Sequence, residues 1–154
     1  MTLGSKGSPG PRREQTSDGV PNPPAGRILL MDDDPDIRGV AAAMLEVLGY
    51  EVECAADCPG TVALYREALA RGTRFDAVIL DLTVAGGPGG RETLEQLRGV
   101  DPAVRAFASS GYSDDQVLAN PPSFGFVAAI GKPYTVDQLA ETLRRGFAAL
   151  GGER

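Results

Sequence analysis

Five short apolar runs alternate with segments of helical periodicity from Arg27 to Leu150, and this alternation limits the folds open to the chain more than any other feature. Apolar runs of strand length separated by amphipathic helical segments are typical of β-α-β units. Such units have right-handed crossovers and place helices on both faces of a parallel sheet. The pattern therefore predicts an α/β fold: a doubly wound, five-stranded parallel sheet of flavodoxin-like order 2-1-3-4-5 with five helices.

The spacing of apolar residues also predicts where these elements lie. The expected strands comprise residues 28–31, 50–55, 75–80, 103–108 and 125–130. The expected helices comprise residues 35–48, 58–71, 90–99, about 113–119 and 135–149. Asp34 followed by Pro35 is typical of a helix N-cap with proline at the first helical position. The inward stripe of that first helix is expected to contain Ile37, Val40, Met44, Leu45 and Leu48.

The first 26 residues differ in composition from the rest of the chain. They contain five Gly and five Pro but only four apolar residues, too few to offset the entropy of ordering. We therefore expect a disordered linker over residues 1–25, one domain over 26–150 and a short tail over 151–154. No segment has the apolar stretch of a secretion signal or a membrane span, so we expect a soluble, cytoplasmic protein without membrane attachment of its own.

Charge and rare residues exclude several functions. Residues 27–154 carry 12 basic and 19 acidic side chains, a balance of −7, which disfavours binding to nucleic acid. The chain has no histidine, and this excludes Ser-His-Asp catalysis, histidine-ligated zinc and phosphohistidine chemistry on its own residues. Cys54 and Cys58 are too few for a four-cysteine zinc site and are expected to be reduced thiols.

Polar residues end four of the five predicted strands: Asp32 and Asp33, then Asp81, then Ser109 or Ser110, then Lys132. In a doubly wound sheet these positions meet where ligands bind. Converging carboxylates repel one another unless a cation compensates them, and Mg²⁺ prefers such oxygen ligands.

The same residues fit a phosphoryl clamp, in which Mg²⁺, Lys132 and Ser110 each meet one oxygen of a transferred phosphoryl group. Asp81 is then the nucleophile, because it is central and lies about eight residues before the next helix, too far to cap it. Asp34 is assigned to capping instead.

These motifs, which read ILLMDDD, DAVILDL, SSG and GKPY, resemble the receiver domain of two-component response regulators over about residues 26–150. The resemblance implies a phosphoacceptor rather than an enzyme, with at most weak autophosphatase activity. Its phosphodonor would be a histidine kinase or a histidine phosphotransfer protein, and it would signal by conformational change.

The resemblance also implies a role for each site residue. Asp33 and Asp81 would bind Mg²⁺ directly, Asp32 would bind it through water, and Thr83 would offer its backbone carbonyl. Asp81 would accept the phosphoryl group, which Ser110 and Lys132 would contact, and the bond from Lys132 to the next proline would be cis.

The sequence departs from the family pattern at three places. Ala85 stands where proline is usual, the loop before Gly90 is one residue longer than usual, and Ala129 replaces the aromatic residue that switches on phosphorylation. The SSGYS run, the glycine-rich loop and Ala129 are most similar to receivers at the C-terminus of hybrid sensor histidine kinases.

Two other classes of function compete with this interpretation. A haloacid-dehalogenase-type phosphatase would use Asp32 and Asp34, a later Ser and Lys, and the pair Asp114 and Asp115, but it would leave Asp81 without a role. A flavodoxin-like cofactor protein would need a phosphate-binding loop after the first strand, where three aspartates repel phosphate.

Overall fold

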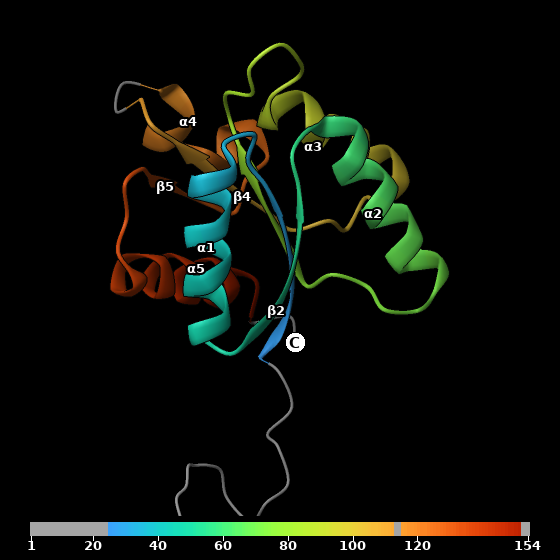
Figure 1. The fold of residues 1–154 in the computed structure, drawn as a ribbon, viewed down its shortest axis with the longest axis horizontal. Helices are drawn as coiled ribbons and strands as arrows, with labels where there is room; N and C mark the ends of the chain where they lie inside the picture. Colours follow the sequence, from blue (N-terminus) through green and yellow to red (C-terminus); the bar gives the residue numbers. More distant parts are fainter. Residues whose placement is uncertain (1–24, 113–114, 152–154) are drawn as a thin grey trace, which may run out of the picture.

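The computed structural model describes residues 25–112 and 115–151, which form a five-stranded sheet covered by helices on both faces (Figure 1). The strands are β1 (Gly26–Met31), β2 (Tyr50–Ala55), β3 (Ala77–Asp81), β4 (Ala106–Ser110) and β5 (Ala128–Gly131). All neighbouring strands are parallel, in the order β2-β1-β3-β4-β5. The predicted fold class and strand order are confirmed.

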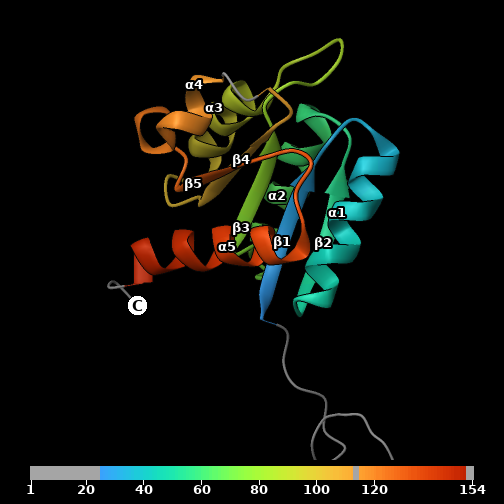
Figure 2. The same cartoon turned by 90° about the vertical axis from the view of Figure 1, so that its left-hand side faces the viewer.

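The helices divide between two hydrophobic clusters on opposite faces of the sheet. They are α1 (Pro35–Val47), α2 (Cys58–Ala70), α3 (Gly90–Val100), α4 (Gln116–Ala119) and α5 (Val136–Gly151). The side chains of β1 point alternately to the two faces of the sheet. Ile28 and Leu30 pack with α1 and α5, whereas Leu29 and Met31 pack with α2 and α3. Figure 2 looks onto the face that α1 and α5 cover.

The first helix begins as its sequence predicts. The Asp34 carboxylate accepts hydrogen bonds from the backbone N–H groups of Asp36 at 2.9 Å and Ile37 at 3.3 Å, and Pro35 is the first helical residue. Asp34 is therefore used as an N-cap, which leaves the two preceding aspartates to the end of β1.

The predicted inward stripe of α1 is wrong for two residues. Ala41 and Leu45 are buried against the sheet, but Ile37 is 38% exposed and Val40 is 57% exposed. Ala41 and Leu45 lie one turn apart on the side of the helix that faces the sheet. The neighbouring residue Val40 therefore lies on a different side and faces solvent. An apolar strip of α1 is thus left outside the core.

Three strands begin later than predicted. Residues 103 and 104 fold into a turn on Asp101, which accepts from Ala103 N–H on its side chain and from Val104 N–H on its carbonyl, so β4 starts at Ala106. β3 starts at Ala77 rather than residue 75, although Phe75 is buried. β5 starts at Ala128 because Gly125, with φ of 91°, ends a preceding turn of helix.

That turn is a 3₁₀ helix, η1 (Pro121–Phe124), which the sequence analysis did not predict. It follows α4, which is shorter than expected, and residues 113–114 of the expected helix lie outside the described residues. Two successive prolines cannot continue an α-helix, but they suit the first positions of a new turn.

Most of the two predicted tails, residues 1–24 and 152–154, lies outside the described residues. Ala25 belongs with the fold, since its N–H donates to the carbonyl of Gly49 at 2.9 Å. None of the helices in the described part of the chain combines the length and the apolar character that crossing a bilayer requires.

Candidate functional site

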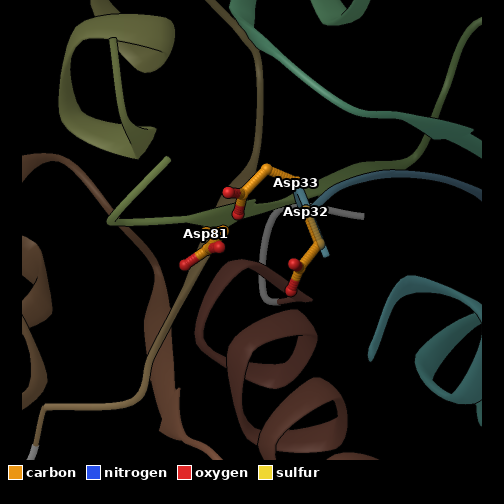
Figure 3. Close-up of side chains that lie close together, drawn as sticks. All are labelled: Asp32, Asp33 and Asp81. Carbon is orange, nitrogen blue, oxygen red and sulfur yellow. The ribbon is translucent and has the colours of Figure 1, made fainter. Parts of the chain in front are cut away.

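Three carboxylates gather at the carboxyl ends of β1 and β3 (Figure 3). Asp32 and Asp33 directly follow β1, and Asp81 is the last residue of β3, the strand that pairs with β1. One oxygen from each side chain lies within 4.8 Å of the others. Because β1 continues to β2 on one side and pairs with β3 on the other, these acids sit at the point where strand order reverses.

Backbone groups of the loops fix the orientation of each carboxylate. Asp32 Oδ1 accepts from Asp34 N–H at 3.0 Å, and Asp81 Oδ1 accepts from Thr83 N–H at 3.2 Å. Asp33 Oδ2 accepts from Ala85 N–H at 3.1 Å, which joins the loop after β3 to the loop after β1.

Lys132 brings a positive charge to the acids from the end of β5. Its Nζ lies 3.1 Å from Asp32 Oδ2 and 3.4 Å from Asp81 Oδ1, and the Lys132–Pro133 bond is cis. Burial alone would lower the pKa of Lys132, but the hydrogen bond to Asp32 and the charges of Asp81 and Asp32 outweigh it and raise that pKa. The lysine is therefore a permanent cation of the site.

The electrostatics of the site disfavour the charged form of Asp81. Burial raises the pKa of its carboxyl to about 6; Asp32 reinforces this, whereas Lys132 and the Thr83 N–H oppose it. Burial, together with the charges of Asp32 and Asp81, also raises the pKa of Tyr134 to about 12. One lysine does not balance three neighbouring carboxylates, so the site retains an excess of negative charge that a cation would relieve.

The two serines at the end of β4 are both buried but have different neighbours. The Ser110 hydroxyl accepts from Tyr112 N–H at 3.0 Å and so closes a turn in its own loop. Ser109 is paired in register with Asp81. The structure thus brings Asp32, Asp33, Asp81, Thr83 and Lys132 together, while the Ser110 hydroxyl is engaged with the chain that follows it.

A cleft of about 720 Å³ opens above these residues, and much of its lining is apolar. Its apolar lining includes Ile37, Val40, Met44, Tyr112, Pro133 and Tyr134. The cleft therefore joins the acids to the exposed apolar strip of α1.

Sequence reasoning missed some residues that shape this site. The Arg38 guanidinium donates to the carbonyl of Asp32 at 2.8 Å and so anchors the loop that carries the acids. Its place one helical turn after the N-cap Asp34 was the available signal. Tyr134 also lines the cleft, and its place two residues after Lys132 in the GKPY motif was the available signal.

Comparison with known proteins assigns the folded part of the chain, which carries this site, to a known family. The family described as the response regulator receiver domain matches residues 28–144. The nitrogen assimilation regulatory protein NtrX of Azorhizobium caulinodans is 32% identical over 124 residues, which are 80% of this chain and 26% of that protein. A response regulator receiver protein of Anaeromyxobacter sp. is 35% identical over 115 residues, 75% of this chain and 46% of that protein.

The solved structures agree with the sequence matches. The CheY-like response regulator receiver domain protein of Methanospirillum hungatei JF-1 superposes with a TM-score of 0.70 at 26% identity, covering 84% of this chain and 98% of that one. The chain spans about a quarter and about half of the two curated relatives. These similarities give no support to a haloacid-dehalogenase phosphatase.

Proposed function

Because the chain belongs to the response regulator receiver domain family of two-component systems, we propose that Asp81 accepts its phosphoryl group. The observation that carries this assignment is the central position of Asp81, buried between Asp32, Asp33 and Lys132. An oxygen of the Asp81 carboxylate attacks phosphorus, the bond from phosphorus to the donor's imidazole nitrogen breaks, and the imidazole leaves. The product is an acyl phosphate on Asp81.

We assign Mg²⁺ to the three carboxylates. Their donor set fits this ion, since three oxygens within 4.8 Å of one another and an unbalanced negative charge suit a small divalent cation. Asp33 and Asp81 would hold the ion directly, Asp32 would hold it through water, and Thr83 would contribute its carbonyl. When bound, the ion neutralises negative charge on the incoming phosphoryl oxygens.

Lys132 and Ser110 complete the proposed clamp. The Lys132 ammonium already lies 3.4 Å from Asp81, so a small movement transfers it to an oxygen of the phosphoryl group. To donate to a phosphoryl oxygen, the Ser110 hydroxyl must turn its O–H away from the Tyr112 carbonyl, 3.5 Å from its oxygen, so phosphorylation would rearrange this loop. The protein then acts as a phosphoacceptor with at most weak autophosphatase activity.

The phosphodonor is a phosphohistidine on a partner, a histidine kinase or a histidine phosphotransfer protein, because this chain has no histidine. This donor docks on the surface of α1 that lines the cleft, which is formed by Ile37, Val40 and Met44. These side chains are exposed or half-buried and adjoin the acids, so a partner helix that covers them brings its histidine to Asp81. Such an encounter belongs in the cytoplasm.

The assignment of Asp81 is tested by labelling the full chain with acetyl phosphate or phosphoramidate and Mg²⁺. Intact mass should show one phosphoryl group that is stable to acid and labile to base. Asp81→Asn should abolish it, and Asp137→Asn, an exposed carboxylate on α5, is the matched control that should be labelled normally. Undiminished labelling of Asp81→Asn would refute the assignment.

The docking surface is tested with two valines of the same helix. Val40 lines the cleft, whereas Val47 is 75% exposed and lies beyond the cleft lining. Val40→Asn should slow transfer from a phosphohistidine protein that labels the wild type, while labelling by acetyl phosphate stays unchanged. Val47→Asn should leave both unchanged. If the two variants behave alike with the protein donor, the surface lies elsewhere.

A further inference from the structure

Asp33 is held in a different way from the two other carboxylates of the site. Lys132 pairs with Asp32 and Asp81, at 3.1 and 3.4 Å. Among the described residues, this lysine forms no ion pair with Asp33. Oδ2 of Asp33 instead accepts from the backbone N–H of Ala85 at 3.1 Å, 52 residues further along the chain. Figure 3 shows the Asp33 carboxylate turned toward Asp81, so a backbone group of the loop after β3 holds this acid in the site.

The loop that supplies this N–H is anchored on both sides of Ala85. Val84 is 7% exposed and packs in the hydrophobic cluster with α2 and α3. Where α3 begins, the N–H of Gly89 donates to the carboxylate of Glu92 at 3.1 Å. Ala85 itself is exposed, so its side chain is not fixed by the core. The anchored neighbours therefore place its N–H at Asp33.

Ala85 occupies the second position of a turn that suits proline. The N–H of Gly87 donates to the carbonyl of Val84 at 3.4 Å, and Gly86, at the third position, has φ of 76°. This is the pattern of a type II turn, in which proline is common at the second position. Proline has no N–H to donate. The alanine thus keeps a donor that the residue best suited to the turn would lack.

A carboxylate that holds a small cation benefits from a fixed orientation. Mg²⁺ requires near-ideal octahedral geometry, so a ligand that rotates freely binds it less well. Groups that hydrogen-bond a metal ligand from outside fix its orientation, and their loss typically lowers metal affinity by about ten- to a hundredfold. The Ala85 N–H occupies one oxygen of Asp33 and leaves the other for an ion. Because the N–H is uncharged, it orients the acid without neutralising it, as a second lysine would.

We propose that the backbone N–H of Ala85 is the positioning group for Asp33, holding Oδ2 so that the other oxygen is already oriented to bind Mg²⁺. This inference rests on the metal site of the proposed function. The same hydrogen bond ties the loop after β3 to the end of β1, so it acts before any ion binds. It therefore contributes both to the affinity for Mg²⁺ and to the stability of the metal-free protein.

Ala85→Pro removes this donor at a position where the turn accepts proline. In calorimetric titration of the full chain, the Mg²⁺ affinity of this variant should be about tenfold lower, and its melting temperature in EDTA should fall by a few degrees. Ala85→Ser is the conservative variant, which keeps the N–H and should therefore keep the wild-type affinity. Equal Mg²⁺ affinity of Ala85→Pro and the wild type, or an equal loss in Ala85→Ser, would overturn the inference.

A double variant separates loss of this hydrogen bond from distortion of the loop. In an Asp33→Ala background the acceptor is gone, so adding Ala85→Pro should raise the melting temperature in EDTA by about a degree or more, because proline restricts the unfolded chain. A fall in this background, or a double variant that does not fold, would show that proline disturbs the turn and would overturn the inference.

Calorimetry of Asp33→Ala with Mg²⁺ tests the proposed metal site separately. Undiminished Mg²⁺ binding by this variant would contradict the metal site itself. Loss of binding in Asp33→Ala with no loss in Ala85→Pro would contradict only the role of the Ala85 N–H. The two proposals can therefore fail independently.

Discussion

Replacing Asp81 by asparagine should stabilise the metal-free protein at neutral and alkaline pH. Burial raises the pKa of this carboxyl from 3.8 to about 6, with Asp32 contributing. An acid whose pKa is higher in the folded state loses folding stability as pH rises through that interval, and the full cost remains above it. Two pKa units correspond to about 3 kcal/mol. Asparagine avoids this cost because it carries no charge, while Lys132 keeps Asp32 as its partner.

Urea unfolding in EDTA measures the effect. At about pH 8 the free energy of unfolding of Asp81→Asn should exceed that of the wild type by up to about 3 kcal/mol, which is roughly 10 °C in melting temperature. Near pH 4 the gap should close, since the wild-type carboxyl is then protonated when folded. Asp137→Asn should show no comparable gap, and Mg²⁺ should narrow it by stabilising the wild type. Equal stability at pH 8, or a gap that does not depend on pH, would refute the electrostatic account.

Three further outcomes are expected. Asp33→Ala should lose Mg²⁺ binding and labelling together, because its carboxylate is one of the two proposed direct ligands; equal labelling rates with and without EDTA would contradict the metal assignment. Deleting residues 1–24 should change the melting temperature by no more than about two degrees, since they offer no apolar face; a larger loss would mean that they pack on the domain. Amide exchange with beryllofluoride should slow at residues 110–112 and 115–120, where little buried apolar surface holds the chain, and protection confined to the loop after Asp81 would exclude this route of switching.

The sequence predicted the fold and the gathering of the acids because both depend on short-range signals. Apolar runs such as residues 28–31 and 77–80 end at aspartates, and the ends of adjacent parallel strands must meet. Asp34 was recognisable as a cap because the proline after it fixes the helix start. These features need no knowledge of how helices dock on the sheet.

What the sequence could not predict depends on docking and on local competition for hydrogen bonds. Val40 and Ala41 are adjacent and both apolar, and only the way α1 lies on the sheet leaves Val40 outside. Ala103 and Val104 have apolar side chains that suit a strand, but Asp101 draws their N–H groups into a turn. The Ser110 hydroxyl is held by its own loop, a preference that a strand-end motif does not express.

If the donor docks on α1 as proposed, the two faces of this helix are under different selection, one for the choice of partner and the other for folding. Ala41 and Leu45 are constrained by the core, whereas Ile37 and Val40 line the cleft and contribute little to burial. Substitutions of exposed residues usually change the free energy of unfolding by less than about 0.5 kcal/mol. Ile37 and Val40 can therefore be replaced with little effect on folding. A duplicated copy of such a domain could therefore acquire a new phosphodonor through a few changes on one helix, while the strand ends that carry the chemistry stay as they are.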